Sequence, residues 1–202
     1  MTLDKYRDLA DRMLGPFVGG AKRLGISPDG VSVVAFVAAA AAAVVFYLAG
    51  SDPVLYLAGA VLVFVNGWLD LVDGALAREL DVSSRAGDLL DHVLDRYADI
   101  VLLVGLAAGI GRYDIGLAAV TGVLMTSYLG TQAQAVGLDR VYGGLVGRAD
   151  RLALIGITAG VAAFYTDAVA GLTIVGWLLV ALALVGHLTA LQRFYYSMRA
   201  LS

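Results

Sequence analysis

Residues 31–49, VSVVAFVAAAAAAVVFYLA, contain no charged side chain and decide the fold class of the chain. A helix needs about 20 mostly apolar residues to cross the hydrocarbon core of a bilayer. The rest of the 202 residues agree, because 60% of the chain is hydrophobic and 15% is charged, and the mean hydropathy is +0.82. A soluble domain carries about 25% charged residues. The sequence therefore predicts an all-α integral membrane protein.

Six apolar segments are predicted to form transmembrane helices. They are residues 31–49, 54–69, 100–111, 115–138, 152–166 and 168–192. The helix that contains the third segment is expected to begin earlier, in the charged stretch around Gly87, because the apolar part alone is too short to span a bilayer. No internal repeat is visible, so the inverted-repeat architecture of transporters has no support.

The first 30 residues differ from the rest because charged and apolar side chains are interleaved. The apolar residues that recur at helical spacing are Leu3, Tyr6, Leu9, Ala10, Met13, Leu14 and Phe17. This pattern predicts an amphipathic helix lying in the membrane interface, and the alternative is a surface helix packed on its own protein. We therefore expect an interfacial segment, residues 1–30, followed by a six-helix transmembrane domain, residues 31–202.

The distribution of lysine and arginine predicts the orientation in the membrane. Every Lys and Arg except Arg112 lies in the N-terminal segment, in residues 78–96 or 138–151, or near the C-terminus. Six spans place these four regions on one side of the membrane, and loops rich in Lys and Arg remain in the cytoplasm. We therefore expect an integral cell-membrane protein whose charged side faces the cytoplasm.

Composition also excludes several classes of site. The chain has no cysteine and only two histidines, His92 and His187, so thiolate or histidine-rich metal sites are not expected. The formal net charge of −3 gives no electrostatic reason to expect nucleic acid as a partner.

Two acidic stripes stand out in residues 66–100, NGWLDLVDGALARELDVSSRAGDLLDHVLDRYADI. Asp70 and Asp73 are three residues apart, and Asp91 and Asp95 are four apart, so each pair shares one helix face. A short connection makes the two helices antiparallel neighbours, and the stripes are then expected to face each other. Carboxylates at close range repel by about 4 kcal/mol per pair at moderate dielectric, so a compensating positive charge is required.

That positive charge has two possible sources. Ligands that are all oxygen favour a hard cation such as Mg²⁺, Mn²⁺ or Ca²⁺. The alternative is pairing of the aspartates with Arg78, Arg85 and Arg96. Gly74 follows the first stripe and Gly87 precedes the second, and a missing side chain allows close approach of either a ligand or another helix.

These residues form one extended pattern. It reads Asp70-x-x-Asp73-Gly74-x-x-Ala77-Arg78, then eight residues, then Gly87-x-x-x-Asp91-x-x-x-Asp95. The pattern resembles the signature of the CDP-alcohol phosphotransferases, and the resemblance extends over the predicted interfacial helix and six spans. It implies a homodimer with an active site open to the cytoplasm, and transfer of a phosphatidyl-type group from a CDP-linked lipid to an alcohol with release of CMP. Residues 31–202 would then be the catalytic domain.

The resemblance also implies roles for individual residues. The metal, Mg²⁺ or Mn²⁺, would be held by Asp70, Asp73, Asp91 and Asp95. Asp95 would in addition be the general base for the attacking hydroxyl. The CDP-binding residues would be Asp70, Asp73, Gly74, Ala77, Arg78 and Gly87.

Asp88 and Asp99 share the face of the second stripe but lie outside the signature. The motif places neither on the metal, so we expect asparagine at either position to be milder than at the four signature aspartates. Asp88 is expected to pair with a nearby arginine.

Three arginines are candidates for binding the phosphate of the acceptor. Arg148 and Arg151 share one helix face, and Arg193 lies at the same membrane level. Guanidinium groups bind phosphate with paired hydrogen bonds. The order Gly147-Arg148-Ala149-Asp150-Arg151-Leu152, followed by Gln192-Arg193, is similar to family members that use inositol phosphate.

The acceptor and the lipid remain open at this point. Members that use inositol phosphate tend to carry basic residues near the end of the fourth span, where this chain has Thr131-Gln132-Ala133-Gln134. Glycerol phosphate therefore stays an alternative, and serine is a weaker one because it has no phosphate. The motif does not distinguish diacylglycerol from archaeol. From other classes, a divalent-cation transporter and an intramembrane aspartyl protease also use intramembrane aspartates.

Overall fold

The computed structural model describes residues 7–82, 84–138 and 146–202, which fold into seven α-helices. Their bounds are α1 (Arg7–Arg23), α2 (Pro28–Ala49), α3 (Leu55–Leu80), α4 (Arg85–Gly109), α5 (Tyr113–Ala135), α6 (Arg148–Ala162) and α7 (Ile174–Leu201). The all-α prediction is confirmed, and each predicted segment corresponds to one helix, α2 to α7. Of the predicted amphipathic pattern, the side chains of Leu3, Tyr6, Leu9 and Ala10 lie outside the described part.

Side-chain caps explain where two of these helices begin. Ser84 Oγ accepts a hydrogen bond from Gly87 N at 2.9 Å, so α4 begins at Arg85, ahead of its apolar part as predicted. Thr173 caps α7 in the same way through Gly176 N. The predicted start of the last helix at residue 168 is wrong, because Val169 and Leu172 form a short antiparallel bridge around Ala170 and Gly171, both with positive φ.

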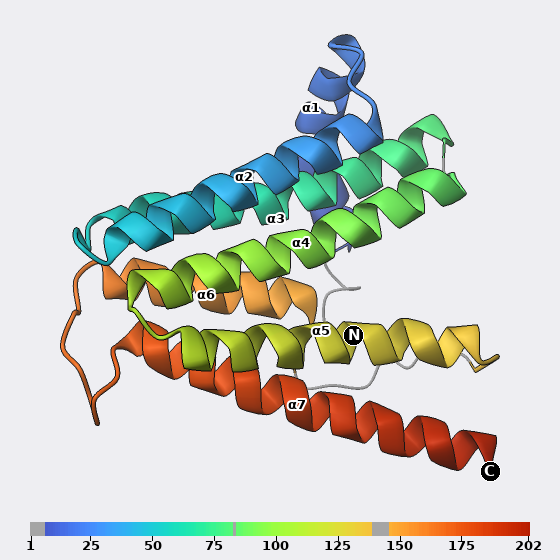
Figure 1. Cartoon of the computed structure of the whole chain (residues 1–202). Helices are drawn as coiled ribbons and strands as arrows, with labels where there is room; N and C mark the ends of the chain where they lie inside the picture. Colours follow the sequence, from blue (N-terminus) through green and yellow to red (C-terminus); the bar gives the residue numbers. More distant parts are fainter. Residues whose placement is uncertain (1–6, 83, 139–145) are drawn as a thin grey trace.

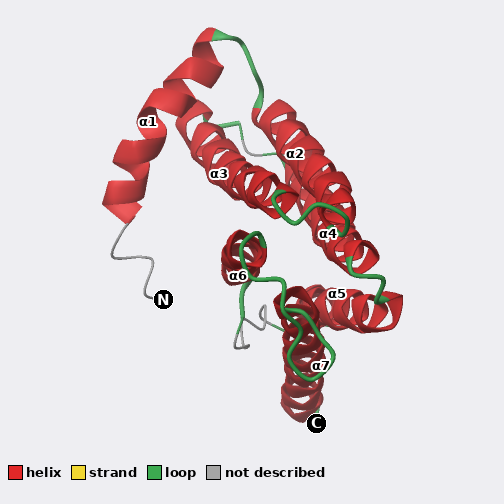
Figure 2. Ribbon diagram, turned by 90° about the vertical axis from the view of Figure 1, so that its left-hand side faces the viewer, coloured by secondary structure: helices red, strands yellow, loops and turns green. Residues whose placement is uncertain are grey.

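The six helices α2 to α7 form one elongated bundle. The α2–α3, α4–α5 and α6–α7 connections lie at one end, and the α3–α4 connection and the C-terminus lie at the other, which we call the charged end (Figure 1). Helix α2 packs against α3 and α4, α5 packs against α7, and α6 packs against α3 and α7. Helix α1 runs across the outside of α3 (Figure 2).

Small residues bring two helix pairs into backbone contact. Gly105 of α4 lies against Ala43 of α2, and a Cβ at Gly105 would come within 2.6 Å of the Ala43 Cα atom. Gly186 of α7 lies against Gly122 of α5, and Thr126 Oγ1 donates a hydrogen bond to the Gly186 carbonyl at 2.8 Å. Close packing of this kind is how helices associate where lipid replaces water. It fixes α2 against α4 and α5 against α7.

Helix α1 has one side on the bundle. Leu14 and Val18 are buried against Val72 and Leu76 of α3, whereas Met13 and Phe17 are exposed. The Phe17 ring also forms a T-shaped pair with Trp68, with ring centroids 5.3 Å apart. The described part of α1 therefore carries apolar residues on both its packed and its outer side.

By length and hydropathy, three of the described helices can cross a membrane. They are α2, α3 and α7, with mean hydropathies of 2.5, 1.8 and 2.2 over their most apolar windows. Helix α4 begins with a run of charged residues, and α6 has only 15 residues. The structure thus supports membrane-spanning helices.

Candidate active site

Helices α3 and α4 each pack against α2 rather than against each other, and this arrangement brings the two acidic stripes together near the charged end. Asp70 of α3 and Asp91 and Asp95 of α4 each place one carboxylate oxygen within 4.8 Å of the others. All three side chains are half-buried rather than solvated. Three converging carboxylates fit a hard divalent cation, which takes part of its shell from protein oxygens and the rest from water or phosphate.

Asp73 lies beside this cluster in a different environment. Its Oδ2 accepts a hydrogen bond from Ser32 Oγ of α2 at 2.7 Å, and the residue is buried. Ser32 was missed by sequence reasoning, although a lone serine near the start of an apolar run was a usable signal. The structure therefore places three of the four predicted ligands in one cluster and the fourth, Asp73, next to it.

Arg148 is the main positive charge at the cluster. From the first turn of α6, its Nη1 donates to Asp70, and its Nη2 lies 2.8 Å from Asp95 Oδ1. The guanidinium therefore bridges two of the candidate metal ligands, a contact that sequence reasoning did not foresee. Of the arginines considered as partners from the sequence, Arg96 contacts Asp95, at 3.6 Å, whereas Arg78 and Arg85 are exposed.

The two aspartates outside the signature occupy unlike positions. Asp88 is exposed, and its Oδ1 lies 3.6 Å from His92 Nδ1, where the sequence predicted an arginine partner. Asp99 is only 4% exposed and accepts a hydrogen bond from Arg151 Nη2 at 2.8 Å. The sequence treated Asp88 and Asp99 alike, but the structure separates a solvated carboxylate from a buried one.

A cleft of about 190 Å³ opens on the α2 side of the cluster. Its lining comprises Pro28, Asp29, Ser32, Asp73, Gly74, Ala77, Val82, Ser84, Gly87, Asp88 and Asp91. A Cβ at Gly87 would lie 2.9 Å from Asp29 Oδ1, and one at Gly74 would lie 3.4 Å from Arg78 Nη1. Four of the six predicted CDP-binding residues, Asp73, Gly74, Ala77 and Gly87, thus line this cleft, and Arg78 adjoins it.

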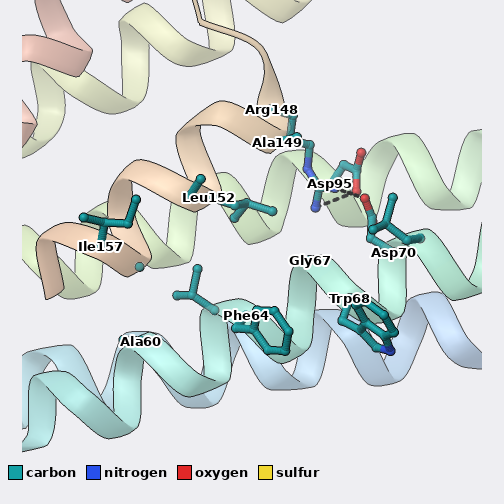
Figure 3. Close-up of a pocket in the computed structure, with 14 residues that line it drawn as sticks. Ala60, Phe64, Gly67, Trp68, Asp70, Asp95, Arg148, Ala149, Leu152 and Ile157 are labelled. Atoms are coloured by element: carbon teal, nitrogen blue, oxygen red, sulfur yellow. Dashed lines mark hydrogen bonds and ion pairs between the residues drawn. The ribbon is translucent and has the colours of Figure 1, made fainter. Parts of the chain in front are cut away.

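A larger cavity of about 660 Å³ opens on the other side of the cluster, between α3 and α6 (Figure 3). Asp70, Asp95 and Arg148 lie at one end of this cavity. Its other walls are apolar or small: Ala60, Val63, Phe64, Gly67, Trp68, Leu71, Ala149, Leu152, Ala153, Gly156 and Ile157. A cavity with one charged end and a long apolar part suits an amphiphilic molecule.

The three predicted acceptor arginines all lie at the charged end. Arg148 contacts the acidic cluster, and Arg151, one turn along α6, contacts Asp99. Arg193 of α7 donates from Nη1 to the Thr126 carbonyl at 2.6 Å. Residues 139–145, which precede α6, lie outside the described ranges.

Comparison with known proteins identifies the family. Residues 26–188 match the CDP-alcohol phosphatidyltransferase family, which is most of the chain. The chain belongs to this family. This CDP-alcohol phosphatidyltransferase is therefore a membrane-bound transferase, and its apolar helices agree with that assignment.

Two similar proteins are named as synthases of inositol phosphate lipids. The chain is 34% identical to the phosphatidylinositol phosphate synthase of Streptomyces avermitilis, over 95% of this chain and 80% of the relative. It is 30% identical to the archaetidylinositol phosphate synthase of Methanothermobacter thermautotrophicus, over 96% of this chain and 93% of the relative. Both matches extend over nearly the whole of this phosphatidyltransferase.

Solved structures agree with the fold and the metal. The phosphatidylinositol phosphate synthase of Mycobacterium tuberculosis with CDP-DAG bound has a TM-score of 0.79 and 28% identity, covering 92% of this chain and 94% of that one. The same protein in complex with manganese and citrate also has a TM-score of 0.79, covering 92% and 88%. A divalent cation, Mg²⁺ or Mn²⁺, is therefore the cofactor of this phosphatidyltransferase, and the acidic cluster offers ligands of the right chemistry.

Proposed function

We propose that this phosphatidyltransferase transfers a phosphatidyl or archaetidyl group from a CDP-linked lipid to inositol phosphate and releases CMP, as a step in membrane phospholipid synthesis. The observation that carries the proposal is Arg148, which joins the acidic cluster to a cavity with a charged end and an apolar body. The names of the relatives support the same acceptor.

The donor would lie across the acidic cluster. Asp91 lines the small cleft, whereas Asp70 and Asp95 line the large apolar cavity. Cytidine in the cleft and lipid in the cavity would place the pyrophosphate between them, next to the carboxylates. Gly74, Ala77 and Gly87 leave the cleft open for the nucleotide, and Arg78 would contact a phosphate.

The residues proposed to hold the metal are Asp70, Asp73, Asp91 and Asp95. When bound, the cation supplies charge neutralisation and alignment for the pyrophosphate. Ser32 holds the Asp73 carboxylate in a fixed orientation through its hydrogen bond.

Asp95 is the proposed general base. Its carboxylate accepts the proton of the acceptor hydroxyl, and the acceptor oxygen then attacks the phosphorus that carries the lipid. The bond from that phosphorus to the CMP oxygen breaks, and CMP leaves with the electron pair. The acceptor phosphate would be held by Arg148, Arg151 and Arg193, because three guanidinium groups offset its repulsion by the aspartates.

A panel of acceptors tests this function. Purified protein in detergent with Mn²⁺ and CDP-diacylglycerol or CDP-archaeol is expected to release CMP fastest with inositol phosphate. Glycerol phosphate is the phosphorylated competitor, and serine and free inositol are the unphosphorylated controls. Faster release with serine than with either phosphorylated acceptor would overturn the proposed role of the arginines. Family membership already decides against a cation transporter.

We also propose that α2 to α7 all cross the membrane, with the charged end in the cytoplasm and α1 in the interface. The six helices share one bundle, and every Lys and Arg except Arg112 belongs to sequence regions predicted on that side. Residues 1–30 would then form the interfacial segment and residues 31–202 the catalytic domain. Family resemblance supports a homodimer, which light scattering in detergent tests directly.

Cysteine labelling tests this topology, because the chain has no cysteine of its own. Ser51→Cys, in the α2–α3 connection, is expected to react with an impermeant maleimide on intact cells. Arg85→Cys, at the start of α4, is expected to react only after the cells are opened. The reverse pattern would place the acidic cluster outside the cell.

A further inference from the structure

Asp99 is a buried carboxylate for which the signature provides no role. It lies one turn beyond Asp95 on α4 and is 4% exposed. Arg151 Nη2 donates to its Oδ2 at 2.8 Å, and Arg96 Nη1 approaches the same oxygen at 3.3 Å. A buried charge is stable only when it is paired, so both guanidinium groups have a strong reason to remain in these positions.

Each of these arginines also lies next to a residue of the candidate site. Arg96 reaches the opposite way to Asp95 Oδ2, at 3.6 Å, and also donates to Ser127 Oγ of α5. Arg151 follows Arg148 by one turn of α6, which places both on one helix face. Charges therefore alternate without a break from Asp70 through Arg148, Asp95, Arg96 and Asp99 to Arg151.

Arg151 also retains hydrogen-bonding capacity. Its side chain is only 8% exposed, and its buried Nε has no partner within the described residues. One Nη group is occupied by Asp99 and Nε is shielded from solvent, so the other Nη group is the part of the planar fork that a ligand can reach. A ligand with several acceptor oxygens, such as a phosphate, matches that remaining capacity.

We propose that Asp99 is a positioning residue that sets the preference for a phosphorylated acceptor by holding Arg151. This inference rests on the proposed function, because it assumes that Arg151 binds the acceptor phosphate. Asp99 fixes the guanidinium of Arg151 from the side of α4, and Arg96 ties the same carboxylate to Asp95. Asp99 itself touches neither the donor nor the acceptor.

The direction in which the acceptor KM changes separates this role from simple electrostatics. Removing a carboxylate also removes a charge that repels phosphate, so charge alone predicts a lower acceptor KM for Asp99→Asn. Loss of positioning predicts a higher KM, by about tenfold, the scale of one misplaced charge-assisted hydrogen bond. Affinity for CDP with Mn²⁺ is expected to stay unchanged. Asp114→Asn is the matched control, because it removes an arginine-paired carboxylate at the opposite end of the bundle.

A double variant tests whether Asp99 acts through Arg151. Asp99→Asn combined with Arg151→Gln is expected to have the same acceptor KM as Arg151→Gln alone. The double variant also leaves no unpaired buried guanidinium at position 151, so it keeps the comparison possible if Asp99→Asn alone does not fold.

The outcomes are distinct. A lower or unchanged acceptor KM in folded Asp99→Asn, or a further rise in the double variant, would overturn the positioning role. A wild-type protein that releases no CMP with inositol phosphate would instead overturn the proposed function. If the wild type is active and Asp99→Asn loses CDP affinity to the same extent as acceptor affinity, Asp99 is a structural residue only.

Discussion

CMP release is expected to fall by roughly 10²- to 10⁴-fold when Asp95 is replaced by asparagine, the usual contribution of a general base. Asparagine keeps the shape of the side chain and one oxygen for Arg148, which lies 2.8 Å from Asp95 Oδ1. It removes the negative charge that accepts the proton of the acceptor hydroxyl. The measurement is CMP release under saturating donor and acceptor, alongside calorimetric binding of CDP in the presence of Mn²⁺.

Binding data decide how that loss is interpreted. CDP affinity is expected to survive in Asp95→Asn, whereas Asp70→Ala and Asp91→Ala are expected to lose Mn²⁺ binding together with turnover. Loss of CDP affinity in Asp95→Asn would show a role confined to holding the metal. Turnover near the wild-type rate in that variant would remove Asp95 from the chemistry.

Arg148→Gln is expected to have two opposite effects. The acceptor KM should rise by about ten- to a hundredfold, because one or two charge-assisted hydrogen bonds to phosphate are lost. The affinity of the substrate-free protein for Mn²⁺ should increase, since Arg148 bridges Asp70 and Asp95 and its positive charge opposes a second cation there. Mn²⁺ titration followed by electron paramagnetic resonance measures the second effect without any turnover.

Arg112→Gln is the control for this experiment, because Arg112 pairs with Asp114 at the far end of the bundle. Arg148→Lys should restore the acceptor KM only in part, since lysine keeps the charge and loses the planar fork. Weaker Mn²⁺ binding in Arg148→Gln would mean that the arginine organises the carboxylates rather than competing for them.

The helices could be predicted because their cause is local. Charge-free runs and the cap at Ser84 suffice to place α2, α4 and their neighbours in the sequence. The start of α7 could not be predicted, since residues 168–173 carry no charge and continue directly into the apolar run of the helix. Their turn depends on positive φ at Ala170 and Gly171.

The candidate site, too, could be predicted only where its residues are close together in the sequence. The spacing of Asp91 and Asp95 predicted that they share one face of α4, and both belong to the acidic cluster. The contact of Arg148 with Asp70 joins residues 78 positions apart, and no local pattern encodes such a pair. The burial of Asp99 was likewise invisible, because its main partner, Arg151 of α6, lies 52 residues away in the sequence.

The bundle also separates two tasks along the chain. The candidate nucleotide cleft and all four signature aspartates belong to residues 28–95, on helices α2, α3 and α4. The candidate acceptor arginines belong to residues 148–193, on α6 and α7. Two features cross this division, because α6 also lines the large cavity proposed for the lipid and Asp99 of α4 pairs with Arg151. Substitutions on α7 can therefore change how the headgroup is held while the nucleotide cleft stays the same, whereas a change at Arg151 calls for a matching change at Asp99.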